Sequence, residues 1–272
     1  MIRKLVERLS REKYFIRNLP SEFSRTPLFV SPDAQLKYLK PGVEGFDKEL
    51  LNIVSEYISK GDVVWDIGSN VGVFAFAAAS IAGRNGHVLA VEPDIWLANL
   101  LQKSARLQAN QNLSVDVLPA AIADSCGIAN FLVADRGRAS NALAKTGGRC
   151  QMGGYREKNL VPMFSLDDLL KISAKPNFIK IDVEGAEVNV LQGAQEILSD
   201  VRPVIYCEVG VPYRAEITEI FRAADYKIFD SSLPQASRFD IEKCGFNTLA
   251  YPAESLRFND SGTFQVVCTT RS

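Results

Sequence analysis

From residue 60 onward, short apolar runs alternate with longer segments in which apolar residues recur at helical spacing. The first three apolar runs are VVWDIG (63–68), HVLAVEP (87–93) and SVDVLPAAI (114–122), and helices are predicted between them over about 71–82 and 95–110. Strands that alternate with helices form a parallel sheet covered on both faces, and their crossovers are right-handed. The pattern therefore predicts an α/β fold.

The alternation is interrupted after residue 124 and resumes at residue 178. Helices are predicted in this second part over about 187–198 and 213–224, so the main domain is expected to cover residues 44–272. The apolar runs that predict further strands are FIKIDV (178–183), VIYCEV (204–209), KIFD (227–230), FNTLAYP (246–252) and TFQVVCTT (263–270).

The first 43 residues follow a different pattern. Ile2, Leu5, Val6 and Leu9 are spaced as on one face of a helix, with basic residues between them. The segment LPSEFSRTPLFVSPD, rich in Pro and Ser, predicts a connecting or capping segment rather than part of a sheet. We therefore expect residues 1–43 to form an N-terminal helical or capping segment. The pattern leaves open whether its helix packs on the core, covers a substrate site, mediates a homodimer or touches a membrane surface.

The segment from Asp124 to about Asn159 interrupts the main domain. GIANFLV (127–133) predicts an added strand, and the following residues are polar and rich in glycine. A loop of this length either packs against the domain or covers a functional site, and its length favours a function.

Composition places the chain among ordinary globular proteins. Of 272 residues, 47% are hydrophobic and 23% are charged, which allows a sizeable core. The net charge of −1 and the pI near 6.0 disfavour a protein that holds long nucleic acid by its phosphates, and favour a small-molecule partner. No apolar run approaches the roughly 20 residues of a membrane span, and the N-terminus is too charged for a signal peptide, so we expect a cytoplasmic protein without a transmembrane segment.

The strand VVWDIG runs directly into a tight turn and a helix. Gly68 permits the turn, Gly72 lets the helix approach the strand, and the helix N-terminus offers backbone N–H groups to a ligand. Glu92 ends the next strand, 92 − 72 = 20 residues after Gly72. At this spacing, the acidic side chain of a nucleotide-binding βαβ unit accepts hydrogen bonds from ribose hydroxyls. Together, these features predict a nucleotide-type cofactor.

The glycine spacing narrows the choice of cofactor. It is G-x-x-x-G rather than G-x-G-x-x-G, and the chain contains no G-K-[ST] phosphate loop, which disfavours an NAD enzyme and a kinase. Asp66 lies inside the turn motif, where its carboxylate would repel a pyrophosphate and suit a positively charged amino group. S-adenosyl-L-methionine carries a ribose, an α-amino group and a sulfonium, so it fits all these features.

The motifs also resemble a known family. GDVVWDIGSNVGVFAFAAA, AVEPD, FSLDDLL, and FIKIDVEGAEVNVLQGAQEIL followed by RPVIYCEV look like the motifs of FkbM-type S-adenosylmethionine-dependent methyltransferases, in matching order over roughly residues 44–252. The resemblance implies a class I methyltransferase (Rossmann-like) fold, whose seven-stranded, mostly parallel sheet has a reversed last strand and helices on both faces. It also implies O-methylation of a hydroxyl, often on a sugar or a secondary metabolite.

The resemblance further implies a cofactor site. Glu92 would hold the ribose, and the stretch from Ala121 to Asp124 would flank the adenine. The residues whose motif position places them at the methionine end of the cofactor are Asp66, Gly68, Ser69, Asn70 and Gly72.

Methyl transfer to a hydroxyl needs alignment and a group that removes the hydroxyl proton. The single histidine, His87, opens a strand, whereas ligands bind beyond the carboxyl ends of strands, so we expect it to be structural. The family often carries a histidine two residues after the acid of VIYCEV, where this chain has Gly210. We therefore expect a carboxylate or a lysine to act, and the candidate carboxylates are Asp182 and Glu184 at the end of FIKIDV and Glu208 at the end of VIYCEV.

Two roles are open for these carboxylates. Mutual repulsion could raise a pKa and make one of them a base, or Asp182, Glu184 and Glu208 could bind a divalent cation such as Mg²⁺ that lowers the pKa of the acceptor hydroxyl. Lys180 lies on the same strand face as Asp182 and is expected to pair with it as a further member of the catalytic cluster. Glu187 is expected to begin the following helix, where a carboxylate is favourable.

The sequence thus predicts an O-methyltransferase that acts on a hydroxyl of a sugar, glycoside or other natural product in a biosynthetic pathway. The alternatives are a nucleic-acid or other N-methyltransferase and a non-catalytic S-adenosylmethionine-binding protein. The near-neutral charge and the lack of an N-P-P-[YF] motif disfavour the first alternative, and the intact site residues disfavour the second. Basic residues between positions 136 and 158 could hold a phosphate-bearing or acidic substrate, or form a solvated loop.

Overall fold

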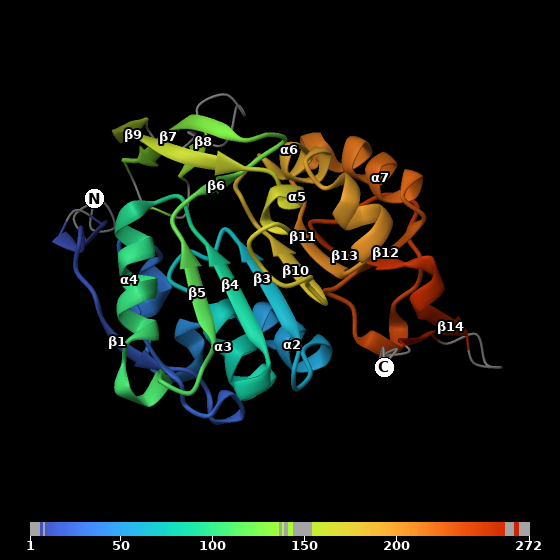
Figure 1. Ribbon diagram of the computed structural model, residues 1–272. Helices are drawn as coiled ribbons and strands as arrows, with labels where there is room; N and C mark the ends of the chain where they lie inside the picture. The colour runs from blue at the N-terminus through green and yellow to red at the C-terminus, as the bar shows by residue number, and fades with distance from the viewer. Residues whose placement is uncertain are drawn as a thin grey trace.

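The computed structural model describes residues 6–7, 9–135, 138, 141–143, 154–258 and 264–266. At its centre lies a seven-stranded sheet with the order β12-β13-β11-β10-β3-β4-β5 (Figure 1). β13 runs antiparallel to both of its neighbours, and the remaining pairs of the sheet are parallel. The strands are β3 (Val63–Ile67), β4 (His87–Val91), β5 (Val115–Leu118), β10 (Phe178–Ile181), β11 (Val204–Glu208), β12 (Tyr226–Asp230) and β13 (Asn247–Pro252). The predicted mostly parallel sheet with a reversed last strand is confirmed.

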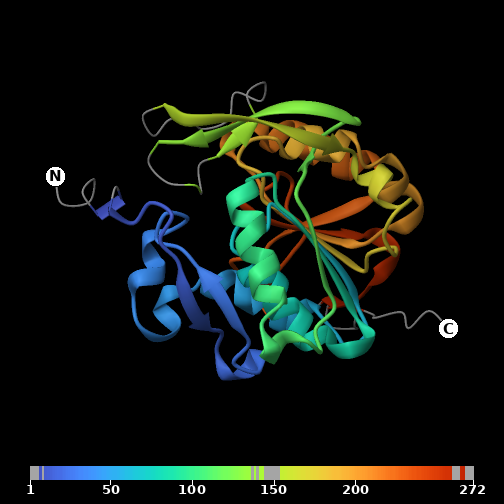
Figure 2. The ribbon, with the colours of Figure 1, turned by 60° about the vertical axis from the view of Figure 1, so that its left-hand side comes forward.

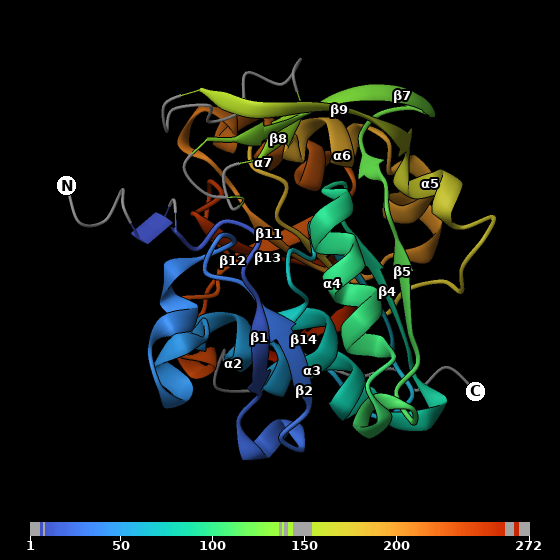
Figure 3. The ribbon, with the colours of Figure 1, turned by 90° about the vertical axis from the view of Figure 1, so that its left-hand side faces the viewer.

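Helices cover both faces of this sheet, as Figures 1 and 3 show. One face carries α2 (Lys48–Tyr57), α3 (Val73–Ala82) and α4 (Ile95–Ala105), and the other carries α5 (Leu166–Leu169), α6 (Glu187–Gln192) and α7 (Arg214–Ala223). Because the central strands are buried on both faces, they read as continuous apolar runs rather than as an alternating pattern. None of the described helices is long and apolar enough to cross a membrane.

Shorter helical turns connect these elements. A π-helical turn, Ile197–Val201, continues the region where a longer helix was predicted after Glu187. The 3-10 turns are Ser21–Phe23, Leu36–Leu39, Gly42–Gly45, Gly83–Asn85, Gln108–Asn110, Val211–Tyr213, Gln235–Ser237 and Ala253–Ser255.

Aspartates fix the start of two helices on the first face. The Asp47 carboxylate accepts hydrogen bonds from the second and third N–H groups of α2, and Asp94 does the same for α4. These contacts satisfy backbone donors that have no partner inside the helix. Asp94 is therefore held at the end of the β4–α4 connection, two residues after Glu92.

A second, four-stranded sheet with the order β6-β9-β7-β8 lies over the end of β5, where the chain passes into it (Figures 1 and 2). The single strand predicted over 114–122 divides into β5 and β6, and the strand predicted over 127–133 is confirmed as β7. The predicted loop up to Asn159 is wrong where β9 begins, because Phe131, Val133 and Val161 form a small core of their own. The strands are β6 (Ala121–Ile122), β7 (Gly127–Ala134), β8 (Ala142–Leu143) and β9 (Tyr155–Phe164).

The N-terminal segment contains a hairpin that the sequence did not predict. β1 (Phe15–Asn18) pairs antiparallel with β2 (Pro27–Val30), so the expectation that LPSEFSRTPLFVSPD is not part of a sheet is wrong. Phe23 and Leu28 are fully buried and belong to the same core cluster as Phe74 of α3, which explains the ordered hairpin. Residues 6, 7 and 9 are helical, whereas residues 1–5 of the predicted helix lie outside the described residues.

A small hairpin follows the central sheet near the C-terminus. It consists of β14 (Leu256–Phe258) and β15 (Phe264–Val266), which pair antiparallel. The strand predicted over 263–270 is therefore seen at 264–266, and its other residues lie outside the described part of the chain.

We predict that Leu28→Ala lowers the free energy of unfolding by about 2 to 5 kcal/mol, because it leaves a cavity in the shared core. Ile16→Ala, on the neighbouring strand, is the matched control, since Ile16 is 48% exposed. Its effect should stay within about 0.5 kcal/mol. Urea denaturation measures both; equal effects of the two substitutions would contradict the burial of Leu28 in this shared core.

Candidate cofactor and catalytic site

A cavity lies at the carboxyl ends of β3, β4 and β10. The turn after β3, the end of β4, the segment after β10 and the second sheet all contribute to its walls. Residues that line it include Gly68, Asn70, Glu92, Ile122, Phe131 and Asp182. Ligands of open α/β sheets bind beyond the carboxyl ends of the strands, so this cavity is the candidate site.

The turn after β3 shapes one wall of the cavity. Gly68 has a φ of 79°, and a β-carbon at this position would overlap the carbonyl oxygen of Asp182. Only glycine therefore allows the end of β10 to approach the turn so closely. Asn70 follows with a φ of 53°, in the left-handed region. The glycine motif thus brings two strand ends together, as well as opening a place for a ligand.

Glu92 provides a buried carboxylate at the end of β4. One carboxylate oxygen accepts a hydrogen bond from the Asn70 N–H (2.8 Å), and the other accepts one from the Asp94 N–H (2.8 Å). Burial raises the pKa of Glu92 to about 8, and the nearby Asp94 carboxylate adds to this rise. Each carboxylate oxygen has more than one acceptor position, so Glu92 can still bind the hydroxyls of a ligand.

Lys180 lies under the site as a buried cation. Its ammonium is 3.1 Å from the Asp66 carboxylate and 3.4 Å from the Asp182 carboxylate, and it donates a hydrogen bond to the Gly68 carbonyl (3.1 Å). Burial alone would lower the pKa of Lys180, but Asp66 and then Asp182 raise it above its usual value. Lys180 therefore remains charged and joins β3, β10 and the glycine turn.

Asp182 and Glu184 line the cavity, whereas Glu208 is not among its lining residues. Burial raises the pKa of Glu208 to about 8; Asp182 and Glu184 raise it further, and Lys180 opposes them. The three predicted carboxylates therefore influence one another. Among the described residues, no group of three or more His, Cys, Asp or Glu side chains is arranged to hold a metal ion.

Several predicted cofactor residues do not line the cavity. Asp66 is fully buried against Lys180, so its carboxylate supports the turn instead of facing the cavity. The Ser69 hydroxyl donates to the Asp66 carbonyl (2.7 Å), and Gly72 caps the N-terminus of α3. Asp124 is exposed, while Ala121 does belong to the wall.

Two further residues lie where the sequence placed them. His87 is at the start of β4, at the opposite end of the strand from Glu92, and its ring contacts the Ser114 hydroxyl (3.0 Å). Glu187 begins α6 as expected, but it is only 3% exposed, and burial raises its pKa. One of its carboxylate oxygens accepts a hydrogen bond from the Gly185 N–H (2.9 Å), so Glu187 orders the turn that carries Glu184.

Several lining residues were missed by the sequence motifs. Arg138, Asn141 and Leu143 lie between β7 and β9, in the segment for which a loop was predicted. The side chains of Arg138 and Arg156 are paired with Asp33. These two arginines are therefore not free to hold a phosphate-bearing or acidic substrate, which was one of the roles considered for the basic residues of this region. The missed lining residues include Gln35, Phe131, Arg138, Asn141 and Leu143.

The order of the central sheet and its one reversed strand define the class I methyltransferase fold. Within this class, the sequence model of the methyltransferase FkbM domain family matches residues 66–228, which is more than half of the chain. The chain therefore belongs to the methyltransferase FkbM domain family.

Comparison with individual proteins gives more distant similarities. Hexuronic acid methyltransferase AglP of Haloferax volcanii is 28% identical over 162 residues, which are 58% of this chain and 61% of that protein. The chain thus aligns with less than two thirds of this relative.

Two solved structures illustrate the structural similarity. The methyltransferase FkbM of Methylobacillus flagellatus has a TM-score of 0.45 and 15% identity, and the alignment covers 81% of this chain and 58% of that one. A SAM-dependent O-methyltransferase of Thermotoga maritima has a TM-score of 0.44 and 12% identity, with 90% and 75% covered. Both scores are too low to add to the assignment, which rests on the family match and the strand order.

We predict that Lys180→Met lowers the free energy of unfolding by about 3 to 5 kcal/mol, because it leaves the Asp66 carboxylate buried without its partner. Lys171→Met is the matched control: Lys171 also pairs with an aspartate, but its side chain is 74% exposed. This control should leave stability almost unchanged, since exposed pairs contribute little. Denaturant titration measures both variants, and a Lys180→Met protein as stable as the control would refute the structural role of the buried pair.

Proposed function

We propose that this protein is an S-adenosylmethionine-dependent O-methyltransferase that acts on a hydroxyl of a sugar, glycoside or other natural product. The observation that carries this proposal is the cavity that places Glu92 and the glycine turn beside Asp182 and Glu184. Membership of the FkbM domain family and the similarity to a relative named as a hexuronic acid methyltransferase support it.

The residues of the cavity fit this cofactor. Glu92 offers free acceptor positions to ribose hydroxyls, and the apolar side chains of Ile122 and Phe131 suit a flat adenine ring. The turn from Gly68 to Asn70 would hold the methionine end. S-adenosylmethionine would supply a methyl group on a sulfonium, and the protein would supply alignment and the removal of a proton.

We assign the removal of the acceptor proton to Glu208, which does not itself line the cavity but ends β11 beside β10 and is close enough to the cavity-lining Asp182 and Glu184 for their charges to act on it. A general base works best when its pKa is near the working pH, and the pKa of Glu208 is raised to about 8. The Asp182 carboxylate already pairs with Lys180 at 3.4 Å, which suits a positioning role beside the acceptor hydroxyl. Glu184, on the cavity wall, would share that role. This division of work uses protein side chains alone. Adding a chelator to the activity assay tests whether a divalent cation also takes part.

The negative charge at this end of the cavity bears on the acceptor. Asp182 pairs with the buried Lys180, and the charges of Asp182 and Glu184 both act on Glu208, so an acceptor that brings a carboxylate close to these side chains would be repelled. We therefore favour a neutral sugar or alcohol at the reacting hydroxyl. An acidic group elsewhere on the acceptor would have to lie away from this end.

The function is tested by incubating the protein with S-adenosylmethionine and a panel of neutral and acidic glycosides and other alcohols, and measuring S-adenosylhomocysteine. We expect binding of S-adenosylmethionine by calorimetry and turnover with at least one hydroxyl acceptor. A chelator added to the same assay should leave the rate unchanged. A protein that does not bind S-adenosylmethionine would overturn the proposal.

We predict that Glu208→Gln lowers kcat by about 10² to 10⁴-fold, because it removes the proton acceptor. Its binding of S-adenosylmethionine should stay within a few-fold of the wild type. In the wild type, kcat/KM should rise with pH through about 8, since Glu208 accepts a proton only when it is ionised and its pKa is raised to about 8. Steady-state kinetics between pH 6 and 10 measures this limb.

Glu216→Gln, on the exposed side of α7, is the control for this substitution. It should keep both the rate and the pH limb. A Glu208→Gln enzyme with a normal rate and the same limb would move the proton acceptor to another carboxylate.

A further inference from the structure

Part of the cavity wall comes from outside the matched family domain. Gln35 lines the cavity, yet it lies 31 positions before residue 66, where the family match begins. Its backbone is fixed, because the Gln35 N–H donates to the Ser31 carbonyl (3.1 Å) in a turn that follows β2. The N-terminal segment thus presents a polar side chain to the candidate cofactor site.

The side-chain carbonyl oxygen of Gln35 is buried and has no hydrogen-bond partner among the residues that the structure describes. A buried acceptor without a donor is costly, and such groups are usually satisfied by a ligand or by water. S-adenosylmethionine has N–H and O–H donors in its α-ammonium group, its ribose and its adenine amino group. An acceptor on the cavity wall is therefore placed to bind one of them.

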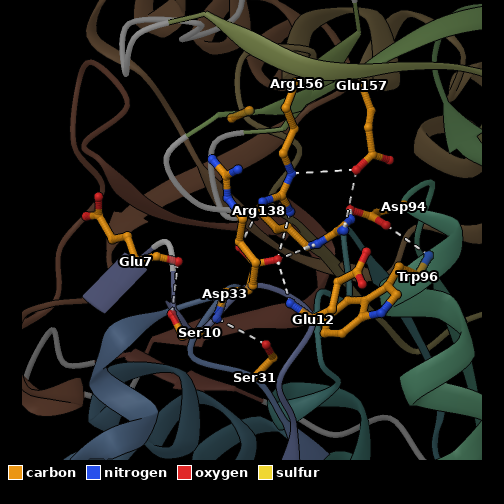
Figure 4. A network of polar contacts seen from close by, with 12 residues as sticks. Glu7, Ser10, Glu12, Ser31, Asp33, Asp94, Trp96, Arg138, Arg156 and Glu157 are labelled. Carbon is orange, nitrogen blue, oxygen red and sulfur yellow. Dashed lines mark hydrogen bonds and ion pairs between the residues drawn. The ribbon is translucent and has the colours of Figure 1, made fainter. Parts of the chain in front are cut away.

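An ion-pair network with a buried centre holds the same segment in place. Its members, which we call the Asp33 network, come from three parts of the chain and are shown in Figure 4. They are Asp33 of the N-terminal segment, Asp94 at the start of α4, Arg138 between β7 and β8, and Arg156 and Glu157 of β9.

Asp33 is the centre of this network. Its carboxylate accepts from the Arg138 Nε (3.0 Å) and from both terminal nitrogens of Arg156 (2.7 and 3.3 Å). Arg138 also bonds to Asp94 and lies over the Trp96 ring at 4.7 Å. Because Arg138 itself lines the cavity, Asp33 connects the N-terminal wall to the wall made by the second sheet.

We propose that residues 31–35 belong to the cofactor site. In this proposal the side-chain carbonyl of Gln35 accepts a hydrogen bond from S-adenosylmethionine, and Asp33 holds the segment in position through its ion pair with Arg138. The inference rests on the proposed function, because it names this cofactor. It adds a binding residue and a positioning residue that lie outside the family domain. Asp33 does not touch the cavity, so its effect on the cofactor passes through Arg138.

The test of Gln35 uses two substitutions and calorimetry with S-adenosylmethionine. Gln35→Leu removes the acceptor with little change in size, and we expect the Kd to rise about tenfold. Gln35→Glu keeps a carbonyl-type acceptor, so its Kd should stay within about threefold of the wild type. Gln111→Leu, at an exposed position, is the matched control and should bind as the wild type does.

The test of Asp33 compares two aspartates that both join the N-terminal segment to the second-sheet region. Asp33→Asn weakens a buried pair, whereas Asp135→Asn weakens the Arg11–Asp135 pair, whose side chains are 40% and 47% exposed. We expect S-adenosylmethionine to dissociate about tenfold faster from the Asp33→Asn protein in stopped-flow measurements, and at the wild-type rate from the control.

The outcomes separate this inference from the proposed function. If the wild type binds S-adenosylmethionine and Gln35→Leu binds it equally well, the inference is overturned and the proposed function stands. If the wild type does not bind this cofactor, both fall. If Asp33→Asn and Asp135→Asn release it at the same rate, the positioning role is overturned. An Asp33→Asn protein that fails to fold leaves the decision to the Gln35 pair, which keeps the network intact.

Discussion

The site depends on one buried cation. Lys180 is 3% exposed and pairs with residues of two strand ends, because a charge so deeply buried must be neutralised. Lys180 and Asp66 are partners in the register of β10 and β3, so their ion pair also fixes how these strands align. The same ammonium bonds to the Gly68 carbonyl and thereby holds the turn whose shape opens the cavity.

This arrangement separates the carboxylates into those that support and those that can react. Asp66 is fully buried in its ion pair with Lys180, and Asp182 pairs with the same ammonium from the cavity side. Glu92 and Glu208 do not pair with a cation at close range in the described structure, and burial raises the pKa of both to about 8. A single lysine in a strand thus creates different environments for acids that look alike in the sequence.

The sequence predicts what depends on local pattern. The central strands follow from apolar runs, and the place of Glu92 follows from its distance to the glycine turn. β9 was missed because YREKNLVPMF has three consecutive charged residues after its first position and contains a proline, which hides the strand pattern, and its Arg156 pairs with a partner more than 100 residues away. Gln35 and Asp33 were missed for the same reason, since contacts between distant segments leave no periodic signal. The motif also could not show that Asp66 faces Lys180 instead of the cavity.

The two ends of the cavity differ in charge for a structural reason. Near Arg138, the guanidinium groups of Arg138 and Arg156 are matched by Asp33 and Asp94, so this end carries ion pairs without a free cation among the described contacts. Near Lys180, Asp66 and Asp182 both pair with one ammonium and Glu208 acts on it through its charge, so carboxyl groups outnumber the cation. Under the proposed function, a negative environment favours a sulfonium and an α-ammonium group and opposes the premature formation of an alkoxide. The proton of the acceptor would then be lost only as the methyl group is transferred. The rate of transfer would therefore depend more on the alignment of the acceptor hydroxyl with the methyl group than on the strength of the base.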